Sequence, residues 1–230
     1  LASSVHSRDV LLNTSYKKKD RQTGQESGEV RTSVPIEVLI EGADLETFKI
    51  VKNKDLKLTS LKDDLNSIPE KFAYLCVGHW MQGDLGHDRK NIGLTVKWFY
   101  ELFRGIEKPP ALILKCSLGT SSYLSRREIL KRLHDIRSLM GPGKKFPPIY
   151  LLHGDFTDDE MNELYNHHKI KSMISLTKGE GFGRPLLEFS LTGKPIIVSN
   201  WSGQVDFMHG DYTTLIPGKL EKLHPSSVME

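Results

Sequence analysis

Two glutamates separated by seven residues, Glu180 and Glu188, flank a glycine-rich run in the segment 175–193, SLTKGEGFGRPLLEFSLTG. Carboxylates accept hydrogen bonds from hydroxyl groups. Gly181 and Gly183 precede a helical pattern, and the free N–H groups at the start of a helix suit an anionic or hydroxyl-rich ligand. These residue types at this spacing predict a crevice that binds a sugar or a nucleotide.

Two neighbouring cations, Arg89 and Lys90, could supply the complementary charge. They follow the first strand of the repeating part of the chain, whereas Glu180 and Glu188 follow the fourth. In a parallel sheet both loops open onto one crevice beyond the carboxyl ends of the strands. This would place the cations against a diphosphate and the carboxylates against sugar hydroxyls. The alternative is that Arg89 and Lys90 decorate a solvated helix start and that Glu188 is merely exposed.

The elements that must position these residues alternate between strand and helix from Lys71 onward. Capping boxes mark helix starts at Ser125 and Thr157, each followed three residues later by a glutamate, and Gly193 is a candidate C-cap. Short apolar strands that alternate with helices predict an α/β fold with a doubly wound parallel sheet. The expected strands are 72–77, 111–116, 149–153, 172–176, 195–200 and 213–216, and the expected helices are 91–104, 125–140, 157–168 and one beginning near Phe182, with a helical turn at 205–208.

The first 70 residues have a different texture, being mostly polar and irregular. The pattern predicts a short helix over 5–12, a mobile loop to residue 33 that includes the lysines 17–19, and a strand over 35–41. A polar connector with helical fragments follows over 43–69. The lysine run is typical of a solvated surface.

Composition indicates a folded protein, because 38% of the 230 residues are hydrophobic and 27% are charged. The net charge of +3 comes from scattered basic residues and gives no strong indication of nucleic-acid binding. Cys76 and Cys116 both lie in apolar runs, which predicts reduced cysteines in the core. The sequence shows neither a membrane-span pattern nor a signal-peptide pattern, so we expect a cytoplasmic protein.

Other chemistries fit the sequence less well. The third glycine of a dinucleotide-binding motif is replaced by Leu186, and no acidic residue ends the next strand. No phosphate-binding loop of the G-x-x-x-x-G-K-[ST] type occurs. His167 and His168 are adjacent but lack zinc-ligand spacing, and the G-x-S-x-G turn of a hydrolase nucleophile is missing.

Several segments carry a resemblance to a known family, in this order: VGHWMQGDLGHDRKNIGLTVKWF, LILKC, IYLLHGDFTDDEMNELY, SLTKGEGFGRPLLEFSLTGKPIIVSNWSG and DFM. Together they resemble the C-terminal domain of retaining glycosyltransferases of family 4, which have the GT-B fold. The resemblance implies a Rossmann-like, donor-binding domain over 71–230. Residues 1–70 are similar to the end of the family's N-terminal domain and its linker, and we expect them to be partly flexible.

The resemblance also implies roles for the charged residues. Lys90, with Arg89 beside it, would neutralise the donor diphosphate, and Glu188 would hold the ribose hydroxyls. Glu180 would hold the transferred sugar. We therefore expect Glu180, Lys90 and Arg89 to be the catalytic group. The sugar and its adjacent phosphate would also meet the backbone amides of Gly181, Phe182 and Gly183.

The same resemblance places the base pocket after the third strand, at His153, Gly154 and Phe156. The family often has Gly-Arg after its first strand, with the arginine gripping phosphate. Here the pair is Gly78-His79, so His79 takes the position of that arginine. Either Arg89 compensates for its loss or phosphate binding is weaker.

The implied activity is transfer of a hexose from a nucleotide-diphosphate sugar, with UDP or GDP sugars expected, to an unknown acceptor such as a glycan or a lipid. The family retains anomeric configuration and uses no metal ion, and no cofactor is expected. The alternatives are another GT-B enzyme, such as a sugar-nucleotide epimerase or phosphorylase, and a non-catalytic sugar-nucleotide-binding module. An acceptor-binding half in a longer chain, a partner chain and an oligomer all stay open.

Overall fold

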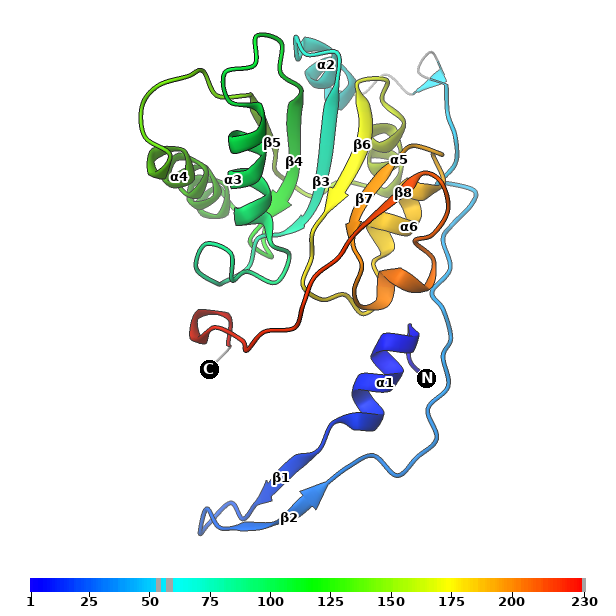
Figure 1. The fold of residues 1–230 in the computed structure, drawn as a ribbon. Helices are drawn as coiled ribbons and strands as arrows, with labels where there is room; N and C mark the ends of the chain where they lie inside the picture. Colours follow the sequence, from blue (N-terminus) through cyan, green and yellow to red (C-terminus); the bar gives the residue numbers. More distant parts are fainter. Residues whose placement is uncertain (53–54, 57–59, 229–230) are drawn as a thin grey trace.

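A computed structural model describes residues 1–52, 55–56 and 60–228, and a six-stranded parallel sheet forms its centre (Figure 1). The strand order is β5-β4-β3-β6-β7-β8. The strands are β3 (Ala73–His79), β4 (Ala111–Ser117), β5 (Ile149–Leu152), β6 (Ile170–Ser175), β7 (Ile196–Ser199) and β8 (Thr213–Ile216). The chain builds outward from β3 to β5, returns to place β6 beside β3, and then builds in the other direction. This confirms the predicted doubly wound α/β fold.

Helices cover both faces of the sheet (Figure 1). Helices α3 (Ile92–Phe103) and α4 (Tyr123–Leu139) pack on one face, where Val96 and Ile129 join the core around Leu112 and Leu114. The opposite face carries α2 (Ser60–Ser67), α5 (Asp158–Asn166) and α6 (Arg184–Ser190). Because both faces are covered, the central strands are apolar almost throughout.

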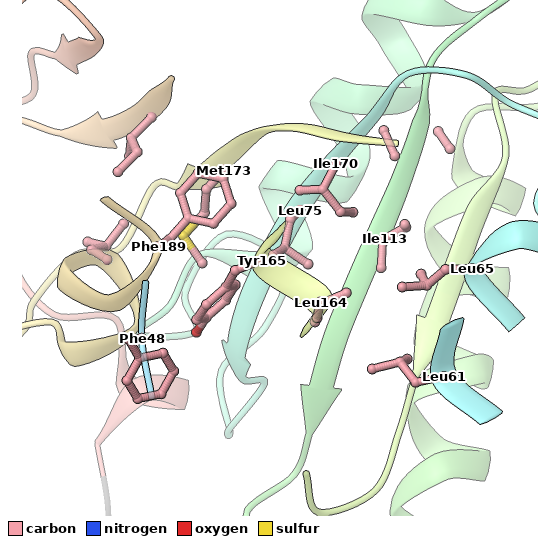
Figure 2. Packing of buried hydrophobic residues seen from close by; sticks show 14 of the residues in the cluster. Phe48, Leu61, Leu65, Leu75, Ile113, Leu164, Tyr165, Ile170, Met173 and Phe189 are labelled. Atoms are coloured by element: carbon pink, nitrogen blue, oxygen red, sulfur yellow. The ribbon is translucent and has the colours of Figure 1, made fainter. Parts of the chain in front are cut away.

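The core on the α5 and α6 face is built around large side chains (Figure 2). Leu75 and Ile113 extend from the sheet, Leu164 and Tyr165 come from α5, and Phe189 comes from α6. All five are completely buried. This packing attaches the two helices that flank the glycine turn to the centre of the sheet.

The N-terminal segment contains more regular structure than the sequence predicts. Helix α1 (Val5–Asn13) is present as expected, but the predicted mobile loop forms an antiparallel hairpin of β1 (Tyr16–Lys19) and β2 (Glu26–Val30). Every residue of both strands is exposed, so the hairpin lacks the alternation that reveals a half-buried strand. A Lys17–Glu26 ion pair of 2.9 Å links the strands.

The strand predicted over 35–41 is wrong. Residues there form a single bridge, in which Ala2 N–H donates to Glu37 O at 2.8 Å and Leu39 N–H donates to Ala2 O at 2.8 Å. Leu39 and Ile40 stay exposed, because no neighbouring strand covers them. The apolar pattern at these positions therefore does not report a buried strand.

Helix boundaries depend on the caps. The Thr157–Glu160 capping box is confirmed, since both of its hydrogen bonds are present at the start of α5. The predicted box at Ser125 is wrong: Ser122 caps α4 and accepts a hydrogen bond from Ser125 N–H at 3.1 Å. Ser125 is buried instead, and its hydroxyl accepts a hydrogen bond from Leu118 N–H. Two serines three residues apart made the assignment ambiguous from sequence.

Both cysteines are free and buried, as predicted, and burial raises the pKa of each thiol to about 12. Among the residues that the structure describes, no helix is long and apolar enough to cross a membrane.

His167, at the end of α5, makes the stability of the fold depend on pH. It is fully buried, and its Nδ1 accepts a hydrogen bond from Lys169 N–H, which requires a neutral ring. Burial lowers the pKa of His167 from 6.5 to about 4, with His168 and Lys169 contributing. The unfolded chain therefore takes up this proton first as the pH falls. Between about pH 7 and pH 5 this should cost about 2 kcal/mol of stability.

Urea unfolding at the two pH values measures this effect. We expect His167→Gln to remove that part of the pH dependence, whereas His134→Gln, at an exposed position on α4, should keep it. Equal pH dependence in the wild type and in His167→Gln would contradict the assignment.

Candidate functional site

The loops that follow β3 and β6 meet at the carboxyl edge of the sheet, where the strand order reverses. Lys178 N–H donates to Arg89 O at 2.9 Å, and the Lys178 ammonium donates to Gly86 O. Thr177 Oγ1 donates to Arg89 O at 3.3 Å. The expectation that these two loops open onto one place is confirmed.

Glu180, Lys90 and Arg89 come together in this place. Glu180 forms one ion pair with Lys90 and another with Arg89, the second at 3.4 Å between Nη1 and Oε2. The Lys90 and Glu180 side chains are 12% and 11% exposed, so this pair is largely shielded from water. Arg89 also donates to Gly179 O at 2.6 Å. Glu180 thus neutralises cations that an anionic ligand would otherwise meet.

A buried aspartate positions the two cations. Asp88 accepts hydrogen bonds from Ile92 N–H at 2.7 Å and from Gly93 N–H at 3.3 Å, which caps the start of α3. Burial raises the pKa of Asp88, and the two N–H donors act in the opposite direction. Sequence reasoning missed Asp88, because it lies three residues before Asn91, the N-cap of α3, and so outside the position at which a capping side chain is expected.

The glycine turn leads into α6 two residues later than predicted. Gly183 is the N-cap of α6 with a φ of 103°, a conformation that favours glycine. Phe182 is buried and packs on Phe207, with ring centroids 4.7 Å apart. The N–H groups of Gly181, Phe182 and Gly183 have no acceptor within the described part of the chain. They can therefore donate to a ligand.

The loop after β7 holds the glycine turn in place through hydrogen bonds to Glu180. Ser202 Oγ accepts a hydrogen bond from Glu180 N–H at 2.8 Å, and Gly203 N–H donates to Glu180 O at 3.0 Å. Ser202 and Gln204 are buried and bonded to each other. Ser202 is a positioning residue that the sequence did not reveal, because its partner Glu180 lies 22 residues away, and Gln204 in turn holds Ser202.

Glu188 is not merely exposed. It lies on α6 with a side chain that is 11% exposed, and it contacts Tyr165 and Arg184. Tyr165 Oη donates to Glu188 Oε2 at 3.2 Å, and Arg184 Nη2 lies 3.4 Å from Oε1. Burial raises the pKa of Glu188, while Arg184 and the hydroxyl of Tyr165 lower it. Glu188 is held separately from the Glu180 cluster.

The predicted base-pocket residues lie after β5, next to a lysine that sequence reasoning missed. Lys115, near the end of β4, donates to Gly154 O at 2.7 Å, and its ammonium lies 4.3 Å from the centroid of the Phe156 ring. Burial lowers the pKa of Lys115. His153 Nε2 lies 3.1 Å from Ser125 Oγ. A lysine near the end of an otherwise apolar strand was the signal that could have indicated it.

His79 ends β3 at the same edge. Its Nδ1 lies 2.8 Å from Ser117 Oγ, at the end of β4. Burial lowers the pKa of His79, and the nearby positive charges of Lys90 and Lys115 lower it further. These effects favour the neutral ring, so His79 is a poor substitute for the permanent charge of an arginine.

The N-terminal helix reaches the same edge (Figure 1). Ser7 Oγ donates to Gly181 O at 3.1 Å, and Val5 N–H donates to Asp206 Oδ2 at 2.7 Å. The ring of His6 packs edge-on against Trp201 at 5.0 Å. The sequence assigned no role at the site to α1.

A metal centre has no support within the described residues, which contain no group of three or more His, Cys, Asp or Glu placed to hold an ion. His167 and His168 follow α5 and precede β6, at the edge opposite the glycine turn.

Several solved structures have a fold similar to that of this chain. The C-terminal domain of the group 1 glycosyltransferase LpcC from Francisella tularensis matches 77% of this chain over 81% of its own length, at 13% identity and a TM-score of 0.53. The chain has the fold of a GT-B glycosyltransferase C-terminal domain.

Two longer solved structures also match the fold of this chain. Sucrose-phosphate synthase from Thermosynechococcus elongatus matches 79% of the chain at 20% identity with a TM-score of 0.54. HepE from Anabaena, solved with UDP and glucose, matches 79% at 17% identity with a TM-score of 0.51. The chain spans only 39% and 43% of these two proteins. No protein-family model matches the sequence, and no curated protein matches it significantly.

A methyl group at Gly203 should displace the glycine turn. A Cβ atom there would lie 2.1 Å from Gly181 O, whereas a Cβ at Gly179 would meet nothing within 4 Å. We expect Gly203→Ala to lower the free energy of unfolding by about 2 kcal/mol, and the control Gly179→Ala to change it by less than about 0.5 kcal/mol. Chemical denaturation measures both. Equal stabilities would show that the turn tolerates movement at Gly203.

Proposed function

We propose that this chain is the donor-binding domain of a retaining, metal-independent glycosyltransferase that uses a nucleotide-diphosphate sugar. The observation that carries the proposal is the Lys90–Glu180–Arg89 cluster, which lies at the switch point of a glycosyltransferase fold beside the unpaired amides of the glycine turn. The cations would meet the diphosphate, and the free N–H groups would meet the phosphate next to the sugar. Of the two carboxylates, Glu180 would meet the transferred sugar and Glu188 the ribose.

The cluster would rearrange when the donor binds. The diphosphate takes Lys90 and Arg89 as counter-ions, and the Glu180 carboxylate is released to accept a hydroxyl of the transferred sugar. The amides of Gly181, Phe182 and Gly183 donate to the phosphate next to that sugar. The ion pairs seen here therefore hold the cations in position until the ligand arrives.

The chemical step needs charge stabilisation more than it needs a nucleophile from the protein. The bond between the anomeric carbon and the phosphate oxygen breaks, which leaves negative charge on the diphosphate and oxocarbenium character on the sugar. Fixed cations and the turn amides stabilise the leaving group. The acceptor hydroxyl attacks on the same face and gives its proton to the departing phosphate oxygen, so configuration is retained. The two glutamates then act as binding residues and not as a glycosidase pair.

UDP and GDP sugars are the donors that we propose, and HepE, with its bound UDP and glucose, supports the first of these. Lys115 and Phe156, near His153, offer a cation and a ring next to the place proposed for the base. The acceptor would be a hydroxyl-bearing glycan or lipid bound by a further domain or chain.

Calorimetry with UDP, GDP and ADP tests the proposal. We expect the wild type to bind at least one of them, and Lys90→Met to weaken that binding about tenfold or more through loss of a charge-assisted contact. Glu188→Ala should also weaken it. The control Lys131→Met removes an exposed pair with Asp135 on α4 and should leave affinity unchanged.

Thermal unfolding of each variant separates weak binding from poor folding, because Lys90→Met also leaves Glu180 without its nearest counter-ion. A wild-type chain that binds none of the three nucleotides would sink the proposal. So would full affinity in both Lys90→Met and Glu188→Ala.

A further inference from the structure

Tyr165 is a completely buried residue with a polar contact that the proposed function does not use. It lies on α5, and its hydroxyl donates to Glu188 Oε2 at 3.2 Å across to α6. Its carboxylate partner is the residue proposed to hold the donor ribose. Hence the orientation of Glu188 depends on a side chain outside the glycine turn.

The geometry leaves Glu188 with acceptor capacity to spare. An ionised carboxylate offers about four lone-pair sites. Tyr165 occupies one on Oε2, and Arg184 approaches Oε1 at 3.4 Å. The remaining sites can accept two neighbouring hydroxyls, which is the pattern that the 2′ and 3′ hydroxyls of ribose present. The Arg184 side chain is 60% exposed, so it alone holds the carboxylate weakly.

Tyr165 itself cannot move easily. Its ring packs edge-on against Phe189, with centroids 5.6 Å apart, and at a tilt against Phe48, with centroids 6.2 Å apart; Figure 2 shows it between these two rings. Aromatic packing of this kind locks the direction of the hydroxyl. The hydroxyl therefore reaches Glu188 from a rigid base.

The segment that leads into the sheet reinforces this base. Asn166, the last residue of α5, accepts a hydrogen bond from Val51 N–H at 2.9 Å and donates to Lys49 O at 2.9 Å. These contacts hold Phe48 against Tyr165. Residues 48–51 thus contribute to the position of Glu188 without touching it.

We propose that Tyr165 is a positioning residue that fixes the Glu188 carboxylate to receive the two ribose hydroxyls of a nucleoside diphosphate. The inference rests on the proposed donor site. It extends that site to a residue whose effect is specific to the sugar of the nucleotide and not to its phosphates. A purely structural Tyr165, which needs a partner only because it is buried, would make no such distinction.

The test compares two probes, uridine diphosphate and its 2′,3′-dideoxy counterpart, by calorimetry on the wild type and on Tyr165→Phe; if calorimetry shows a different preferred base, the corresponding pair is used. The control is Tyr150→Phe, which removes a comparable hydrogen bond of 2.9 Å, from Tyr150 Oη to Glu70. Glu70 precedes β3, at the opposite edge of the sheet.

We expect Tyr165→Phe to weaken the ribonucleotide about tenfold, the equivalent of one charge-assisted hydrogen bond. Its affinity for the dideoxy probe should change less than about twofold. Tyr150→Phe should change neither. Equal weakening of both probes, or unchanged affinity for the ribonucleotide, overturns the inference and leaves the donor site standing. A wild type that binds neither probe overturns both proposals.

A double variant tests whether Tyr165 acts through Glu188. In a Glu188→Ala background, Tyr165→Phe should have no further effect on the ratio of the two affinities, because its target is gone. An undiminished effect there would show that Tyr165 acts by another route.

The pH profile gives an independent readout. Burial raises the pKa of Glu188 above 4.5, Arg184 and the Tyr165 hydroxyl lower it, and the charge of Asp158 on α5 raises it. Ribonucleotide affinity should fall as the pH falls through this pKa, since the ionised carboxylate is the better acceptor. In Tyr165→Phe this fall should begin at a higher pH. An identical pH profile in the two proteins would overturn the inference.

Discussion

The carboxylate of Glu180 joins the two halves of the site. It bridges Lys90 and Arg89, which follow β3, from its own place after β6. A shielded ion pair of this kind adds little net stability, because desolvation offsets most of the attraction. Its consequence is geometric, because it holds together two loops whose paired residues, Lys90 and Glu180, are 90 residues apart in sequence. The capping of α3 by Asp88 and the support of the turn by Ser202 act on the same arrangement from either side.

The proposed roles divide the edge into two environments. The Glu180 cluster is rich in cations and unpaired amides, which suits the diphosphate and the transferred sugar. Glu188 is shielded from water to the same extent as Glu180, but it lies beside the aromatic packing of Tyr165 and Phe189 (Figure 2). A carboxylate there is costly to bury, and the hydrogen bond from Tyr165 offsets part of that cost. The two glutamates can therefore differ in chemistry although they belong to one motif.

The N-terminal segment takes part in the site at two points. Helix α1 bonds to Gly181 and Asp206 at the carboxyl edge, and residues 48–51 pack on α5 at the back of Tyr165. Movement of this segment would therefore change the positions of both glutamates.

The sequence by itself determined the parallel sheet, the meeting of the 89–90 and 180–188 loops, and the capping box at Thr157. Apolar runs, helical spacing and glycines at turns are properties of short segments, so they can be recognised in the sequence without knowledge of the tertiary structure. It did not reveal the exposed β1–β2 hairpin, whose strands lack a buried face, or the choice of Ser122 over Ser125 as the cap of α4. The support of Glu180 by Ser202, the approach of Lys115 to Phe156 and the hydrogen bond from Tyr165 to Glu188 were decided only by the tertiary structure. Each of these contacts joins residues that no periodicity relates, so packing alone could bring them together.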